Sequence, residues 1–404
     1  MPASMTTVNA ITKEIYQGQI QDQLQSEIVG IKRIEKTSRG VTSEVGGKYV
    51  TFPIRVRRNP SIGYRSEYEN LQDAGNQSYK SVQIGLKYGY GRVEVTGQTM
   101  ELAKTNYQAF ANAMNLEMNG LKNDIAKDVN RIFYGNGTGS LAALTVTSTA
   151  VTVTTANTQY LEVGQVVDVC IAAGTPVSGW TGLVISAINQ STGVVTFATP
   201  PATRVPVTGD YLTRTGNGIV SATVTREPTG LGNIINNTGA LFNVDPSTEP
   251  TWAAVVDANG GTNRALSEAL MIKQTDAVRV NGGNTSLILC GLGVRRAYWS
   301  LLSTNRRFIT TTDFDGGIKG LAFHNGRDIP VVDDIDAPKN QMKFIDESAL
   351  CIYRNADWSW LDTDGNIWKW KVGKDSFEAV LACYWELGTN RRNAHATLND
   401  ITEV

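Results

Sequence analysis

Two stretches near the start of the chain alternate apolar and polar residues. The first covers residues 50–56 and the second covers residues 82–90. A period of two is typical of a strand with one buried face. The connection between them, residues 57–81, is highly charged and offers almost nothing to a core, which is uncommon for a loop inside a compact domain. We therefore predict two paired strands and a projecting loop whose partner is another molecule.

The charges of this loop have both signs, and we take them as candidate contact residues. Complementary charges across an interface set register and orientation more than affinity. A loop whose charges simply face water is an equally open interpretation. The positions concerned are Arg57, Arg58, Arg65, Glu67, Glu69 and Asp73.

The second strand contains glycines that change its pattern. Beyond Gly89 and Gly91 the alternation shifts to Val93 and Val95. Because glycine permits the irregular backbone of a bulge, we predict a bulge or bend at this point.

Apolar residues at steps of three and four predict helices in two segments. One is an amphipathic arm over residues 12–34, and the other is a regular stripe over residues 107–132. At about 1.5 Å per residue the second helix is roughly 40 Å long and must cross its domain as a spine. The run 135–139 follows it, where a phosphate-binding loop would precede a helix, so we interpret these glycines as a helix stop. The candidate contact residues of the arm are Ile15, Leu24 and Ile28.

The remainder of the chain changes character twice. Residues 144–215 are rich in Val, Thr and Gly with short alternating runs, which predicts a small inserted all-β barrel or sandwich. Helical patterns then flank a buried strand near residues 286–290, which predicts an α+β domain. The last third is rich in β pattern and aromatic residues, with a long strand over residues 377–387 and a final strand over residues 395–398.

Composition excludes several classes of protein. Lys+Arg 37 against Asp+Glu 38 gives a net charge of −1, so no overall basic field exists to hold nucleic acid by neutralising its phosphates. The N-terminus lacks the apolar run of a signal peptide, and no stretch reaches membrane-spanning length. We therefore expect no membrane association. Four cysteines are widely spaced and fit reduced thiols better than a disulfide framework or zinc site. They are Cys170, Cys290, Cys351 and Cys383.

Catalytic chemistry has little support, and we predict no enzyme activity, cofactor or metal. Phosphate-loop, nucleophile-elbow and zinc-protease motifs are absent from the sequence, and it contains two histidines, His324 and His395. A thiol–imidazole pair with His324 is a remote alternative. The acidic group at 333, 334 and 336 could serve as metal ligands or acid–base residues, although solvated surface charge is the favoured interpretation. The acidic run 362–366 fits a hairpin turn better than a calcium loop.

Four tryptophans flank this turn, two on each side. Such a ladder could stack sugars or bases, but packing across paired strands explains the spacing more simply. The residues are Trp358, Trp360, Trp368 and Trp370.

The order of these elements resembles the major capsid proteins of tailed bacteriophages with the Hong Kong 97-type fold. Three segments carry the likeness locally: the return strand 87–92, the spine-helix end 128–139, and residues 252–270. None is a catalytic signature, so the specificity of the resemblance depends on their order.

The resemblance implies an α+β fold with N-terminal arm, extended loop, long spine helix, peripheral and axial domains, and an inserted small all-β domain. The implied division is arm 1–48, extended hairpin loop 49–97, spine helix 98–139, inserted domain 140–218, peripheral strands and connection 219–250, axial α+β domain 251–340, and β-rich C-terminal segment 341–404.

By the same resemblance the chain would assemble into pentamers and hexamers of an icosahedral head that encloses double-stranded DNA without sequence-specific binding. A separate scaffolding protein, a portal and a decoration protein would be its partners. Assembly would occur in the host bacterial cytoplasm, and the final place would be the virion capsid. Two alternatives stay open: an encapsulin-like compartment, and a hydrolase or carbohydrate-binding protein that uses the tryptophans or the acidic group.

Overall fold

The three-dimensional structure is a computed structural model of the 404-residue chain. It describes residues 30–37, 49–98, 107–146, 152–172, 174–199, 206–218, 225–304, 312–313, 319–326, 328–362 and 365–404. The predicted arm contacts Ile15, Leu24 and Ile28 lie outside the described residues.

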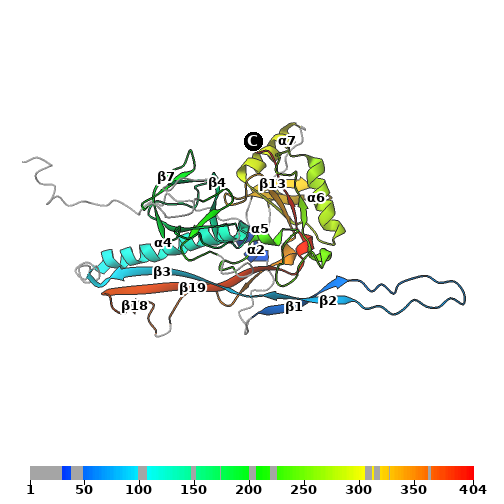
Figure 1. Ribbon diagram of the computed structural model, residues 1–404, viewed down its shortest axis with the longest axis horizontal. Helices are drawn as coiled ribbons and strands as arrows, with labels where there is room; N and C mark the ends of the chain where they lie inside the picture. Colours follow the sequence, from blue (N-terminus) through cyan, green and yellow to red (C-terminus); the bar gives the residue numbers. More distant parts are fainter. Residues whose placement is uncertain are drawn as a thin grey trace, which may run out of the picture.

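A long antiparallel ladder forms the base of the molecule. Strand β3 (Lys87–Thr96) pairs with β19 (Ser376–Thr389) from Thr96↔Ser376 to Lys87↔Trp385. The helix α4 (Tyr107–Tyr134) lies along this ladder (Figure 1), so the predicted spine helix is confirmed. Its end is followed by Gly137 and Gly139, both with positive φ, as the predicted helix stop requires.

The predicted bulge in β3 is wrong, because the pairing of β3 with β19 continues without a shift. The glycines serve close packing instead. A methyl group on Gly91 would lie 2.5 Å from Ile125 Cδ1 of α4, and one on Gly89 would lie 2.9 Å from the ring of Trp358. Glycine at these positions lets the helix and a tryptophan approach the backbone of the strand.

The other edge of β19 carries three short strands, two of which contain a tryptophan each, Trp360 and Trp370. Each of these strands pairs with β19, not with its neighbour across the predicted turn. Trp358 packs against the core, whereas Trp370 is exposed and meets Phe377 edge-on at 5.0 Å. Core packing therefore explains only part of the tryptophan spacing. The strands are β16 (Leu350–Arg354), β17 (Ser359–Trp360) and β18 (Lys369–Trp370).

A seven-stranded mixed sheet forms the second part of the body. Helix α6 (Glu268–Val280) packs against β20, and α7 (Leu292–Thr304) packs against β14. Their apolar faces and the sheet enclose one core, in which each large buried side chain contributes about 1.5–3 kcal/mol. The α+β pattern predicted for this region is confirmed. In spatial order the strands are β10 (Val255–Asp257), β20 (Ala396–Leu398), β15 (Met342–Ile345), β11 (Leu287–Cys290), β14 (Asp328–Asp333), β13 (Lys319–His324) and β12 (Thr312–Asp313).

A closed six-stranded barrel follows α4 in the sequence. Its interior contains Trp180 and Phe197 in edge-to-face contact, with ring centroids 6.1 Å apart. Valine, leucine and isoleucine side chains fill the remaining space, so the Val- and Thr-rich composition forms a self-contained core. The strands are β4 (Ser140–Val146), β5 (Thr152–Thr155), β6 (Val166–Cys170), β7 (Leu183–Asn189), β8 (Val194–Phe197) and β9 (Tyr211–Arg214).

The predicted pair of strands is a two-stranded hairpin that projects from the body (Figure 1). Strand β1 (Val50–Arg57) pairs with β2 (Ser78–Ile84) in the register Val50↔Ile84. Val82 and Ile84 are buried against Val244 and Trp252 at the base of the hairpin. The second predicted strand is thus two strands, β2 and β3, separated at residues 85–86.

Short elements connect these parts. Among the described helices, none is long and apolar enough to span a membrane. The short elements are α2 (Gly30–Thr37), α5 (Leu231–Ile234), η2 (Pro250–Trp252), η3 (Glu347–Ala349) and η4 (Arg392–Ala394).

Candidate assembly surfaces

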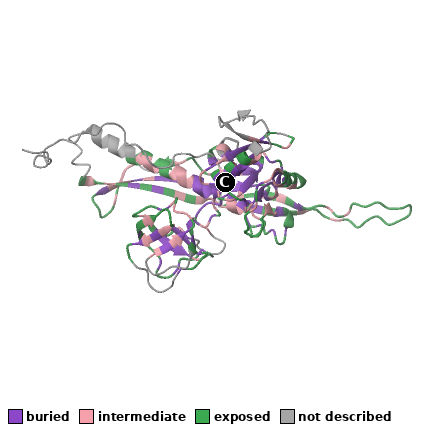
Figure 2. Ribbon diagram, turned by 90° about the horizontal axis from the view of Figure 1, so that it is seen from above, coloured by how far each residue is buried: buried purple, intermediate pink, exposed green. Residues whose placement is uncertain are grey.

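The tip of the hairpin is the most exposed part of the described chain. Residues 58–77 form no strand, and Figure 2 shows them as an almost unbroken exposed ribbon. The sequence analysis treated this segment as polar throughout, but the structure shows apolar side chains in it. Four large apolar side chains face solvent almost completely: Ile62 (83%), Tyr64 (101%), Tyr68 (99%) and Leu71 (87%). Exposed apolar groups gathered on one extended loop are typical of a protein–protein contact.

The structure divides the predicted charged residues of the loop into two groups. Arg57 lies at the base of the hairpin, where its guanidinium contacts Glu249 of the same chain at 3.3 Å. Glu69 stabilises the tip, because its carboxylate accepts a bond from the Ser66 N–H at 3.0 Å. The others extend into solvent and form no ion pair with another described residue; they are Arg58, Arg65, Glu67 and Asp73.

The described end of the N-terminal arm is anchored on the chain's own body. Helix α2 buries Ile31 and Ile34 in the core beneath α4. The Gly30 N–H donates to the Asp334 carboxylate at 3.0 Å, and Arg33 forms an ion pair with Glu347 at 2.7 Å.

The favoured prediction for the acidic group at 333, 334 and 336 was solvated surface charge, and this prediction is wrong. Asp334 is buried and also accepts a bond from Asn130 at 3.0 Å, while Asp333 contacts Arg295 at 3.1 Å. Asp336 accepts bonds from Asn130 and Tyr160 at 2.7 and 2.8 Å. These carboxylates bind the chain to itself through N–H and O–H donors, and no group of three or more candidate metal ligands occurs among the described residues.

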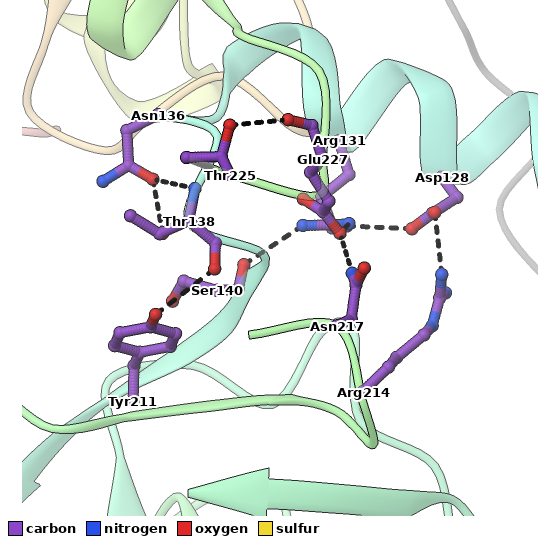
Figure 3. Close-up of polar contacts among 10 residues, drawn as sticks. All are labelled: Asp128, Arg131, Asn136, Thr138, Ser140, Tyr211, Arg214, Asn217, Thr225 and Glu227. Carbon is purple, nitrogen blue, oxygen red and sulfur yellow. Dashed lines mark hydrogen bonds and ion pairs between the residues drawn. The ribbon is translucent and has the colours of Figure 1, made fainter. Parts of the chain in front are cut away.

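An ionic network, buried at Arg131 and Glu227 and partly open to water at Arg214, joins α4, the barrel and the segment that follows the barrel (Figure 3). Arg131 donates to Glu227 at 2.6 Å, to Asp128 at 2.9 Å and to the Ser140 carbonyl at 3.1 Å. Arg214 of β9 pairs with Asp128 at 2.7 Å, so one carboxylate connects two guanidinium groups. The charged side chains of Asp128 and Arg131 on α4 thus face the barrel.

Charge pairing decides the ionisation of this network. Burial alone would lower the pKa of Arg131, but Asp128 and Glu227 outweigh it and raise that pKa. Burial would raise the pKa of Asp128, yet Arg131 and Arg214 outweigh it and hold that pKa below its usual value. Arg131 and Asp128 are therefore both charged at neutral pH.

Nucleophilic chemistry finds no suitable geometry in the described residues. His324 is exposed and its Nδ1 lies 2.8 Å from Asp328. Burial raises the pKa of the Cys290 thiol to about 12, which leaves it protonated and inert. All four cysteines are free thiols, in agreement with the sequence prediction.

Sequence reasoning missed the apolar tip of the loop and the ionic network. The tip residues are visible in the sequence, but they are spaced irregularly within a charged segment and match neither strand nor helix periodicity. The network joins residues about a hundred positions apart, for example Arg131 and Glu227, and no local pattern indicates such pairs.

Comparison with known proteins gives two findings and one negative result. Residues 210–402 match the family model of the SU10 major capsid protein. No curated protein matches the sequence. Among solved structures, the capsid asymmetric unit of cyanophage A-1(L) matches with a TM-score of 0.59 and 16% identity, covering 98% of this chain and 99% of that chain. At this identity the likeness establishes a shared fold.

Weaker structural matches include a native GTA particle capsid and an encapsulin. The former has a TM-score of 0.48 at 11% identity, covering 96% of both chains. The holo-SrpI encapsulin complex of Synechococcus elongatus PCC 7942 has a TM-score of 0.47 at 8% identity, covering 99% of this chain and 96% of that chain.

The mixed α+β architecture, the shared fold with a phage capsid and the family match over the C-terminal part point to the same role. That role is structural, in the capsid of a virion. Together they confirm the resemblance inferred from the sequence, since residues 210–402 match the SU10 major capsid protein family and the whole chain shares the fold of a phage capsid protein.

Proposed function

We propose that copies of this chain form the pentamers and hexamers of an icosahedral head and contact one another through the tip of the β1–β2 hairpin. The observation that carries the proposal is the exposure of Ile62, Tyr64, Tyr68 and Leu71, each at least 83% exposed. Leaving large apolar side chains in water forgoes about 1.5–3 kcal/mol for each residue that could be buried. A second copy of the chain is the partner that a shell offers at high local concentration.

The hairpin suits a contact that is not satisfied within one molecule. Its base is fixed by Val82 and Ile84 in a small core and by the Arg57–Glu249 pair, so the tip is held away from the body. Head-to-tail contacts of this kind build rings and closed shells, because each copy offers one surface and receives another. The charges of Arg58, Arg65, Glu67 and Asp73, which pair with no other described residue, would set the orientation of the tip on its neighbour.

Other partners follow from the same role and belong to the proposal. The arm residues Ile15, Leu24 and Ile28 would form a second contact between copies. The shell would enclose double-stranded DNA without reading its sequence, since a net charge of −1 supplies no basic lining. A separate scaffolding protein, a portal and a decoration protein would act with it, and assembly would take place in the bacterial cytoplasm.

The test is assembly of the expressed full chain, alone and with a scaffolding protein, followed by electron microscopy and sedimentation. A variant with Ile62, Tyr64, Tyr68 and Leu71 all changed to Ser should lower the yield of closed particles about tenfold or more, because each lost apolar contact repeats at every interface. A control variant, Asn70→Ser with Asn76→Ser, changes exposed polar residues of the same loop and should assemble normally. Equal yields from the serine variant and the wild type would contradict the proposal.

The contents of the particles distinguish the alternatives. DNA inside particles from infected cells supports the viral head, whereas a bound cargo enzyme without DNA would support an encapsulin-like compartment. Catalytic activity or sugar binding by a stable monomer would support the hydrolase or carbohydrate-binding alternative.

A further inference from the structure

The barrel and the body share no apolar core. Every buried member of the barrel core lies between residues 141 and 212, whereas the cores of the body draw on other segments of the chain. Trp180, the largest fully buried side chain among the described residues, belongs to the barrel cluster. The barrel therefore satisfies its own hydrophobic requirement, and its position relative to the body is set by something else.

What joins the two parts is a set of polar contacts. Arg214 of the barrel pairs with Asp128 of α4 at 2.7 Å, and the Tyr160 hydroxyl donates to Asp336 at 2.8 Å. Gln159 donates to the same Asp336 oxygen at 3.1 Å. Between these contacts lies a cavity of about 230 Å³, which is lined by charged residues of α4 on one side and polar residues of the barrel on the other.

These contacts are partly open to water. The Arg214 side chain is 47% exposed and the Asp128 side chain 19% exposed. Ion pairs in such surroundings are weakened by solvent and salt, so they hold two bodies together less firmly than a shared apolar core would.

The covalent connections allow movement about one point. The chain enters the barrel after Gly139 and leaves it near Gly216, and both glycines have a φ of 77°. A methyl group on Gly139 would lie 3.0 Å from the Asn217 carbonyl oxygen, so entry and exit are adjacent. Positive φ at both crossings is a conformation that glycine adopts without strain. Within the described residues, the two crossings are adjacent and can therefore act as a single pivot.

We propose that the barrel is a hinged module that a polar latch, formed by Arg214–Asp128 and by Tyr160 and Gln159 on Asp336, holds reversibly against the spine helix. The Arg131–Glu227 pair and the Asn217–Glu227 bond of 2.6 Å lie at the pivot and keep the crossings in place. When the latch is released, the barrel turns as a unit, and neither the barrel core nor the cores of the body are opened. Copies with different neighbours can then hold their barrels at different angles.

Distance measurement by pulsed electron paramagnetic resonance on the full chain tests this directly. Spin labels carried by noncanonical amino acids at Ser186 on the barrel and Glu117 on α4, both exposed, leave the native cysteines untouched. The latch variant Tyr160→Phe with Arg214→Gln should widen the distance distribution about twofold or more, because weakly held modules sample more orientations. A matched control, Tyr79→Phe with Arg279→Gln, makes the same chemical changes at exposed positions far from the latch and should leave it unchanged.

Amide hydrogen exchange on the same proteins separates release from unfolding. Strands β6 to β9 should keep their protection in the latch variant within about twofold. About 1 M salt on the wild type should widen the distribution as the variant does, since it screens the ion pair. An unchanged distribution in the latch variant, or lost protection of the barrel strands with it, would overturn the proposal. Neither outcome depends on particle assembly, so the hinge and the proposed function fail separately.

Discussion

The barrel and the hairpin both extend from the body of the protein, but they differ in whether they bury their apolar side chains. In the barrel, six strands close on one another and bury a tryptophan, a phenylalanine and a shell of aliphatic residues. In the hairpin, two strands pair, but beyond them the chain holds its apolar side chains in water. The barrel is complete as one molecule, and the tip of the hairpin is not. Burial of apolar side chains within a single chain therefore distinguishes a self-contained domain from an exposed projection, even where both contain β strands.

The largest expected effect removes the centre of the barrel. Trp180→Ala should cost about 3–5 kcal/mol, because the ring is 1% exposed and its removal leaves a cavity in the barrel core. Amide exchange should show the loss in β4 to β9 and little change in the ladder of β3 and β19. Equal loss of protection in the ladder would mean that the barrel and the body unfold as one unit, contrary to the comparison.

Acid should affect the body at a pH where it leaves the barrel intact. His395 is buried beside Asp346 and Thr389, and burial lowers its pKa to about 4 from 6.5. The unfolded chain therefore binds a proton that the folded chain refuses, so stability is complete above pH 6.5 and falls by roughly 3 kcal/mol as pH drops toward 4.

Urea unfolding of the body from pH 7 to pH 4 measures this effect. The barrel segment, residues 140–214, contains no histidine and should not share the dependence on this group. His395→Gln should flatten the dependence while lowering stability at pH 7. An equally steep dependence in the glutamine variant would assign the effect to other groups.

The smallest expected effect concerns the tip of the hairpin. Tyr64→Ser with Tyr68→Ser should change the unfolding free energy of the monomer by less than about 0.5 kcal/mol, because both side chains are fully exposed. Thermal or urea unfolding of the monomer measures it. A loss of more than about 1 kcal/mol would show that the tip packs on its own molecule.

The sequence was sufficient for elements whose partners are local or periodic. The stripe over residues 107–132 predicted α4 because one face of a helix repeats every three or four residues, and the alternation at 50–56 predicted β1 for the corresponding reason. The β-rich composition of residues 144–215 likewise indicated the barrel, although barrel and sandwich could not be distinguished.

The failures share a physical cause, which is contact across long stretches of sequence. Asp334 was interpreted as surface charge because its partner, the Gly30 N–H, is 304 positions away. Gly91 was interpreted as a bulge because the sequence does not show that Ile125 of α4 lies against it. The tip of the loop was interpreted as polar because its exposed apolar residues are spaced irregularly and match the periodicity of neither a strand nor a helix.

The adjacent crossings at Gly139 and Asn217 have one more consequence. A segment whose two ends meet can be exchanged for a different one without stretching the rest of the polypeptide. Residues 140–216 could be replaced with a foreign domain whose own termini lie close together. Each copy of the chain would then carry one foreign domain, and the rest of its fold would keep its shape.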